Sequence, residues 1–203
     1  MIRPARSLRD ALERGDDVSD DELDAVFPDE LRSRSLLHWT PVDIALRAAA
    51  LLAPSPASRV LDIGAGVGKL CLVGAAVTGA TWWGVEQNPA LVAAANHAAW
   101  SLELDARTRF VQGDGSRLPW DELDAIYFYN PFTTLMTAPH TSAFVRYATI
   151  QATLRRIEDR LAHARPGTRV VTYYGFGGNI PPGYTRTVRE PAGGDYLELW
   201  LRD

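Results

Sequence analysis

The sequence has one cysteine, no surplus of basic residues and no long apolar run near its start, and each shortage argues against a class of protein. Cys71 has no cysteine partner for an intrachain disulfide or a multi-cysteine zinc site, so we expect a reducing compartment, a core role for this thiol and no metal site. A formal net charge of −4 lacks the basic footprint of a nucleic-acid binder, which makes a nucleic-acid partner unlikely. Charges interrupt the apolar residues of the N-terminal stretch, so we expect no secretion signal, no membrane partner and a cytoplasmic protein.

The length of 203 residues fits a single domain, in which residues 1–40 form a helical N-terminal extension. Acidic residues are concentrated between positions 16 and 30, and we expect them to form a solvated face. Ser19, followed by Glu22 three positions later, predicts a capping box that opens a short helix ending at a proline. Thr40 is expected to cap the next helix.

Residues 41–203 alternate between patterns typical of strands and of helices. Strands are predicted at residues 59–63, 81–86, 108–113, 124–130 and 169–174, and helices at 67–78, 89–104 and 143–161. Such repeats predict a parallel sheet with helices on both faces. Two further strands, 184–190 and 195–202, are joined without a helix and predict an antiparallel hairpin. The expected fold is therefore α/β, a doubly wound, seven-stranded and mostly parallel sheet with an antiparallel terminal hairpin.

The glycine-rich stretch that follows the first strand discriminates between cofactor classes. It reads D-x-G-x-G-x-G from Asp62 to Gly68, with glycines at 64, 66 and 68. A phosphate-binding P-loop needs a glycine at position 63 and Ser or Thr at position 70, and neither is present. A dinucleotide fingerprint needs its third glycine at Lys69. The Asp62 charge would repel a pyrophosphate and suits a cofactor with a cationic end. Lys69 itself is left open between a carboxylate of the cofactor, a carboxylate of the protein and solvent.

These residues resemble the first motif of the class I S-adenosylmethionine-dependent methyltransferases. The resemblance covers roughly residues 40 to 203 and implies that the cofactor is S-adenosyl-L-methionine. It places Glu86, at the end of the second strand, on the two ribose hydroxyls, where one carboxylate can accept from both. It places Asp114 on the adenine amino group, with a turn former as the alternative. The cofactor-binding residues expected are Asp62, Gly64, Ala65, Gly66, Gly68, Glu86, Gln87, Gly113, Asp114, Gly115 and Asn130.

The stretch Tyr129 to Phe132, which follows the fourth strand, is expected to hold the methyl-transfer site. Asn130, Pro131 and Phe132 are the catalytic candidates, because they resemble the N-P-P-Y type motif of amine and amide N-methyltransferases. Nitrogen is therefore the preferred acceptor atom. The same motifs are similar to seven-strand histone lysine methyltransferases, which makes a protein lysine a secondary candidate. Further substrate-binding candidates are Trp39, Tyr129, His140, Tyr173 and Tyr174.

Two alternatives from other classes remain beside this interpretation. An NAD(P)-dependent oxidoreductase would use a similar sheet, but it predicts a different glycine spacing and no terminal hairpin. A non-catalytic partner protein could keep the fold without the reaction, because fold does not fix function. The methyl acceptor, a small molecule or a protein, and the oligomeric state stay open.

Overall fold

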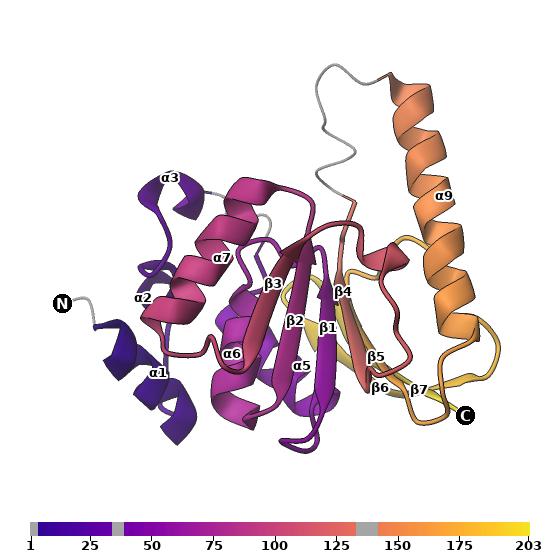
Figure 1. The fold of residues 1–203 in the computed structure, drawn as a ribbon. Helices are drawn as coiled ribbons and strands as arrows, with labels where there is room; N and C mark the ends of the chain where they lie inside the picture. Colours follow the sequence, from indigo (N-terminus) through magenta and orange to yellow (C-terminus); the bar gives the residue numbers. More distant parts are fainter. Residues whose placement is uncertain (1–3, 34–38, 133–141) are drawn as a thin grey trace.

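The computed structural model describes residues 4–33, 39–132 and 142–203. Its centre is a seven-stranded sheet in the order β3-β2-β1-β4-β5-β7-β6 (Figure 1). Strands β1 to β5 are parallel, whereas β7 pairs in antiparallel fashion with both β5 and β6. This arrangement confirms the predicted fold class. The strands are β1 (Arg59–Ile63), β2 (Thr81–Glu86), β3 (Thr108–Gln112), β4 (Ala125–Tyr129), β5 (Arg169–Tyr173), β6 (Tyr184–Ala192) and β7 (Asp195–Arg202).

Strand β1 lies in the middle of the parallel part and is buried on both faces, which explains its nearly continuous apolar sequence. It pairs with β2 on one side and with β4 on the other. The chain therefore leaves β1 in one direction and returns on the opposite side. At such a switch point the loops after the two central strands diverge and leave a crevice at the carboxyl ends of the strands. The register places Asp62 beside Gly84 of β2 and Tyr127 of β4.

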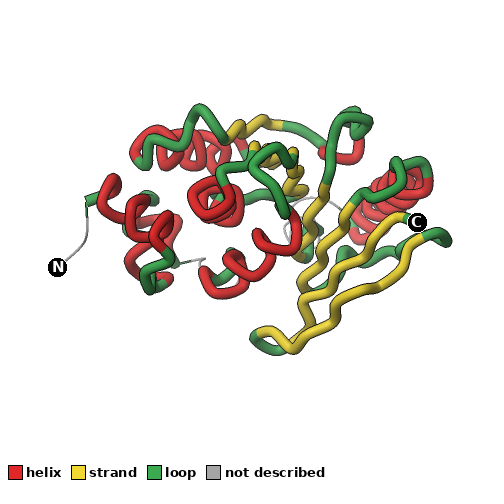
Figure 2. The backbone as a smooth tube through the Cα atoms, turned by 90° about the horizontal axis from the view of Figure 1, so that it is seen from below, coloured by secondary structure: helices red, strands yellow, loops and turns green. Residues whose placement is uncertain are grey.

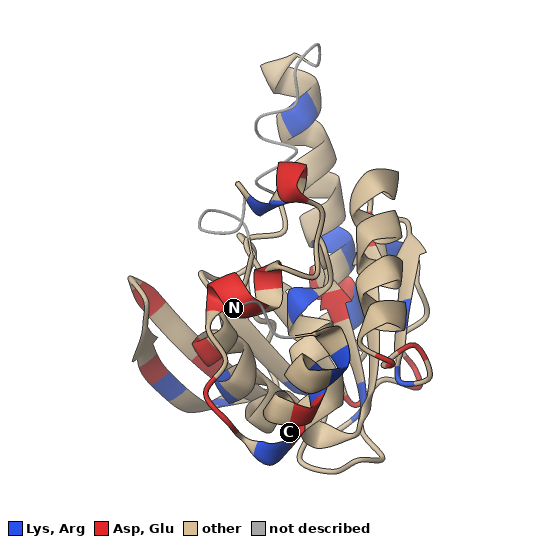
Figure 3. Ribbon diagram, turned by 90° about the vertical axis from the view of Figure 1, so that its left-hand side faces the viewer, with Lys and Arg blue, Asp and Glu red and all other residues tan. Residues whose placement is uncertain are grey.

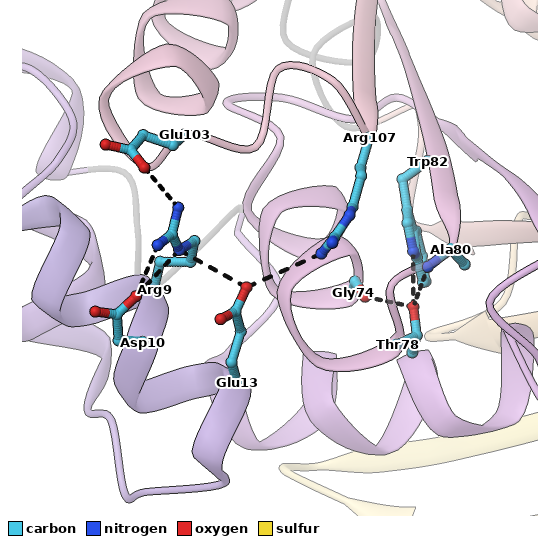
Figure 4. Close-up of polar contacts among 9 residues, drawn as sticks. All are labelled: Arg9, Asp10, Glu13, Gly74, Thr78, Ala80, Trp82, Glu103 and Arg107. Atoms are coloured by element: carbon cyan, nitrogen blue, oxygen red, sulfur yellow. Dashed lines mark hydrogen bonds and ion pairs between the residues drawn. The ribbon is translucent and has the colours of Figure 1, made fainter.

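One face of the sheet is covered by α5 (Val42–Leu52), α6 (Lys69–Thr78) and α7 (Pro89–Ser101) (Figure 2). Trp82 of β2 is fully buried on this face. Its indole nitrogen donates a hydrogen bond of 3.3 Å to Thr78 Oγ1 at the end of α6 (Figure 4). A buried tryptophan with its polar atom satisfied anchors the helix to the sheet.

The opposite face is covered by the long helix α9 (Ala143–Ala162), with the short 3₁₀ helix η1 (Gly115–Arg117) beside it. Only the second half of α9 packs on the sheet, through Leu154, Ile157 and Leu161. Its first half rises beyond the carboxyl edge of the sheet (Figure 1), so that Phe144 is 80% exposed.

In the described residues before this core lie α1 (Ala5–Arg14), α2 (Asp20–Asp24) and α3 (Asp29–Arg32), of which the sequence predicts the short helix that follows Ser19. Helix α1 packs beside α6, and its Arg9 guanidinium donates to Glu103, just after α7, over 2.8 Å (Figure 4). The capping box is confirmed, because Ser19 N donates to Glu22 Oε2 over 3.0 Å and Glu22 N to Ser19 Oγ over 3.3 Å. None of the helices among the described residues has the length and apolar character needed to span a bilayer.

Two expectations for the N-terminal region are wrong. Thr40 does not cap α5, because the helix begins at Val42 and the Val42 N–H instead donates to Asp20 Oδ1 of α2 over 3.0 Å. The acidic run is not wholly solvated either, because Asp20 and Asp24 pair with Lys69. Figure 3 views the molecule from the side of these N-terminal helices, where the acidic residues are red. Both errors arise from contacts between residues distant in sequence, which local patterns do not encode.

Candidate active site

The loop from residue 64 to 68 leaves the carboxyl end of β1 and is fixed by its own backbone and by β2. The N–H groups of Gly64 and Ala65 both donate to the Val85 carbonyl, over 2.9 and 3.1 Å. Gly68, which begins α6, has a φ of 79°, and a Cβ there would lie 2.4 Å from the Phe110 ring. Only glycine suits a position that combines left-handed backbone with so close an approach. The spacing of the glycines therefore predicts the conformation of the loop.

Glu86 is hydrogen-bonded directly to the glycine loop. The carboxylate accepts from Gly66 N over 3.1 Å and from Asn88 N over 2.9 Å. A carboxylate has about four lone-pair sites, so two remain for hydroxyl donors. Gln87 is exposed beside it, and the Asn88 side chain caps α7 by accepting from Ala90 N over 2.9 Å. The structure thus brings Glu86 to the glycine loop, and Gln87 to the surface next to it.

Asp62 lies at the base of the loop and is only 4% exposed. The one hydrogen-bond partner of its carboxylate among the described residues is the Cys71 thiol, with Sγ 3.8 Å from Oδ2. Burial is the main reason why the pKa of Asp62 rises to about 7, the thiol contact opposes the rise, and the charge of Glu86 adds to it. A thiol is a weak donor. A buried carboxylate with so little compensation is poised to accept from a cationic group.

A pocket opens directly above Asp62, at the switch point between β1 and β4. Trp39 and Thr40 reach it from the N-terminal region, and Trp39 packs edge-on against Phe27 with ring centroids 5.0 Å apart. Thr40 and the buried Tyr127 share a hydrogen bond of 3.2 Å between their hydroxyls. The pocket is lined by Trp39, Thr40, Asp62, Gly64, Ala65, Val67, Lys69, Leu70, Tyr127 and Tyr129.

The segment of residues 113–115 follows β3, as the sequence predicts, but the Asp114 carboxylate is already well engaged. It accepts from Ser116 N and Oγ, at 3.0 and 2.6 Å, and from the guanidiniums of Arg117 and Arg156, at 3.2 and 3.0 Å. Burial opposes ionisation, yet the hydrogen bonds from Ser116 and the charge of Arg156 outweigh it, so the pKa of Asp114 lies below its ordinary value. An adenine amino group at this position would compete with these donors.

Asn130 and Pro131 bring the end of β4 against the glycine loop. Asn130 has a φ of 40°, in the left-handed region that asparagine tolerates better than most residues, and its N–H donates to Gly175 O over 3.3 Å. A Cβ on Gly64 would lie 3.2 Å from Pro131 Cβ. The catalytic candidates and the loop are therefore neighbours. Phe132 is buried at 5% exposure on the α9 side of the sheet.

Three tyrosines gather where β4 and β5 end. The rings of Tyr129 and Tyr173 lie 4.9 Å apart, and those of Tyr173 and Tyr174 lie 4.8 Å apart. Burial, with the neighbouring Tyr174 and Tyr129, raises the pKa of Tyr173 to about 12, so its phenol stays neutral. Tyr174 has a φ of 57° and is 46% exposed. The substrate candidates Tyr129, Tyr173 and Tyr174 thus form one cluster beside Asn130, whereas His140 lies outside the described residues.

The sequence patterns missed four residues of this site: Asp20, Asp24, Thr40 and Tyr127. One signal was present, because a spacing of four puts both carboxylates of α2 on one helix face. No comparable local signal marks Thr40 or Tyr127. Among the residues described, no group of His, Cys, Asp and Glu is arranged to hold a metal ion.

The strand order and the glycine loop at the switch point define the Rossmann-like fold of class I methyltransferases. Residues 60–155 match the family model of the methyltransferase domain. Residues 60–155, just under half of the chain, are therefore similar to a methyltransferase domain, and this match supports S-adenosylmethionine as the cofactor. No curated protein matches the chain in sequence.

Three solved structures illustrate how widely the fold is shared. An RNA methyltransferase from Salinibacter ruber, crystallised with S-adenosyl-L-homocysteine, is 23% identical with a TM-score of 0.58, over 80% of this chain and 92% of that one. TrmN from Thermus thermophilus is 22% identical with a TM-score of 0.57, over 83% and 52%. The mitomycin 7-O-methyltransferase MmcR is 16% identical with a TM-score of 0.55, over 80% and 54%. The aligned part of this chain spans about half of the last two proteins.

Proposed function

We propose that the protein transfers a methyl group from S-adenosylmethionine to a nitrogen atom of a small molecule or a protein, beside Asn130. The observation that carries the proposal is the contact between the two halves of the site. Pro131, next to Asn130, lies against Gly64 of the loop, and a Cβ on Gly64 would be 3.2 Å from Pro131 Cβ. A cofactor held on the loop would therefore lie beside Asn130, which would be the residue to orient the acceptor.

The residues around the loop fit this cofactor. The Asp62 carboxylate, buried with a thiol as its described partner, would accept from the cofactor ammonium. Glu86 keeps two lone-pair sites for the ribose hydroxyls. Gly66 has a φ of 57°, and a Cβ there would meet no atom within 4 Å, so open space lies over the loop at this point. When bound, S-adenosylmethionine supplies an electrophilic methyl group on a sulfonium.

The chain's own contribution is alignment and exclusion of water, because methyl transfer is an in-line displacement that needs little covalent assistance. Asn130 is proposed to orient the acceptor nitrogen through its side-chain amide, which both donates and accepts. The Tyr129, Tyr173 and Tyr174 rings are proposed to hold the rest of the acceptor, with Tyr173 as a neutral phenol.

The acceptor follows from the site and not from the fold. Proteins with this fold include an RNA methyltransferase and a mitomycin 7-O-methyltransferase, whose acceptors differ in size and in chemistry. The net charge of −4 favours a small molecule or a protein over RNA. Asn130, which follows the fourth strand, supports nitrogen rather than oxygen as the methyl acceptor atom.

Calorimetry tests the cofactor, and a variant tests the reaction. We expect the protein to bind S-adenosylmethionine and not NAD; the opposite outcome would overturn the proposal in favour of an oxidoreductase. Fractionated lysate with methyl-labelled cofactor would then reveal the acceptor. Asn130→Ala should leave the Kd for the cofactor within about threefold and lower kcat about a hundredfold or more. Asn96→Ala, at an exposed asparagine of α7, serves as the matched control.

If the turnover of Asn130→Ala equals that of the wild type, Asn130 has no role in the reaction. Cofactor binding without labelling of any fraction would favour a non-catalytic partner protein.

A further inference from the structure

Lys69 is the one lysine among the 21 basic residues of the chain, and it is only 2% exposed. It occupies the first turn of α6, directly after the glycine loop. A cation at a helix N-terminus opposes the helix dipole, and a buried cation must be paired. Lys69 would therefore destabilise the fold at this position unless specific partners stabilise its charge.

Helix α2 provides that arrangement. The Lys69 ammonium donates to Asp24 Oδ1 over 2.7 Å and also donates to Asp20 Oδ1. Asp20 is held in turn, because its Oδ1 accepts from the Val42 N–H at the start of α5 over 3.0 Å. The two carboxylates fix the direction of the ammonium and tie the N-terminal region to the loop.

The described hydrogen bonds use two donors of the Lys69 ammonium, and Lys69 is among the residues that line the pocket above Asp62. Lysine carries three N–H donors, and two of them are used by α2. The Trp39 ring, 5.9 Å from Nζ, is the other neighbour of the charge in the described part of the chain. The pocket lining thus includes a buried lysine together with a buried carboxylate whose partner among the described residues is a thiol. An α-amino acid in its zwitterionic form has the complementary pair of charges.

We propose that Lys69 binds the carboxylate at the amino-acid end of the cofactor while Asp62 binds its ammonium, and that Asp20 and Asp24 are positioning residues for Lys69. The proposal rests on the proposed function and names a further cofactor-binding residue for it. Asp20 and Asp24 carry more negative charge than Lys69 neutralises. The carboxylate of the cofactor arrives together with the cofactor's own ammonium, so the amino-acid end as a whole adds no net negative charge. The N-terminus of α6 also favours an anion.

The test compares two ligands that differ in that carboxylate alone: S-adenosylmethionine and its decarboxylated analogue. Calorimetry should show that the wild type binds S-adenosylmethionine about tenfold or more tightly than the analogue, since the analogue lacks the acceptor of a charged hydrogen bond. In Lys69→Met the ratio should fall below about twofold, and in Lys69→Arg most of it should return. A ratio that Lys69→Met leaves unchanged would overturn the proposal.

Two controls keep this result interpretable. Lys69→Met removes the cation that pairs with the buried Asp24, so a triple variant with Asp20→Asn and Asp24→Asn removes the carboxylate charges as well. The ratio of two affinities in one variant does not depend on how much of the sample is folded. A wild type that binds neither ligand would refute the proposed function itself.

A spectroscopic measurement gives an independent readout, because one lysine gives one side-chain signal. In protein labelled with ¹³C,¹⁵N-lysine, the Lys69 side-chain resonance should shift when S-adenosylmethionine is added and stay within its linewidth when the decarboxylated analogue saturates the site. Equal shifts with both ligands would show that Lys69 responds only indirectly and would contradict direct binding.

Discussion

Asp62→Asn should stabilise the protein at neutral and alkaline pH while weakening cofactor binding. The change replaces a buried carboxylate by an amide of nearly the same shape. Burial raises the pKa of Asp62 from an ordinary 3.8 to about 7. Each pKa unit corresponds to about 1.4 kcal/mol, so ionised Asp62 costs the folded protein about 4 kcal/mol above pH 7.

The sign follows from proton linkage. Between pH 4 and pH 7 the folded protein holds a proton on Asp62 that the unfolded chain has released, so this group lowers stability as the pH rises. Asparagine removes that dependence. Relative to wild type, the variant should therefore gain about 3 kcal/mol in free energy of unfolding between pH 5 and pH 8.

Urea unfolding of both proteins at several pH values measures this gain, since all other titrating groups are common to the two. Asp121→Asn, at an exposed carboxylate, should follow the wild-type curve and serves as the control. The Kd for S-adenosylmethionine should rise about tenfold to a hundredfold in Asp62→Asn, because one charged hydrogen bond is lost. Parallel stability curves for wild type and Asp62→Asn would refute the reasoning about Asp62.

Two further predictions concern the same loop. In the wild type, S-adenosylmethionine should bind more weakly as the pH falls below about 7, by up to about tenfold for each pH unit. The reason is that the cofactor ammonium needs ionised Asp62, and the pKa of Asp62 is about 7. Calorimetry across this pH range measures the affinity, and a Kd that does not change with pH would contradict the prediction. Gly68→Ala should lower the free energy of unfolding by about 3 kcal/mol or more, because alanine adds left-handed strain and a Cβ 2.4 Å from Phe110. Gly66→Ala, where the Cβ meets open space, should cost only about 1–2 kcal/mol in the same urea titration, and equal costs would argue against the packing argument.

The sheet could be predicted because its signals are local. Strands such as β1 and β2 are short apolar runs bounded by glycine or polar residues, and their observed bounds match the predicted ones. The hairpin of β6 and β7 was visible as two strand patterns without a helix between them. The glycine spacing likewise predicts the loop, because Gly64, Gly66 and Gly68 all have the positive φ that glycine tolerates.

The side-chain pairs around the glycine loop join residues that are far apart in the sequence, so local patterns could not predict them. Lys69 pairs with residues 45 and 49 positions earlier, and Asp114 with Arg156, 42 positions later. No periodicity records such pairs, so the sequence alone predicts a cap at Thr40 and a solvated face for the acidic residues of α2. The roles assigned to Asn130, Asp114 and the tyrosines stay predictions.

A crystal structure with S-adenosylmethionine tests the central claim most directly. We predict electron density over the loop of residues 64–68, with the cofactor ammonium at Asp62, the ribose hydroxyls at Glu86 and the methyl group facing Asn130. Cofactor density elsewhere on the protein, or a methyl group facing away from Asn130, would contradict the account.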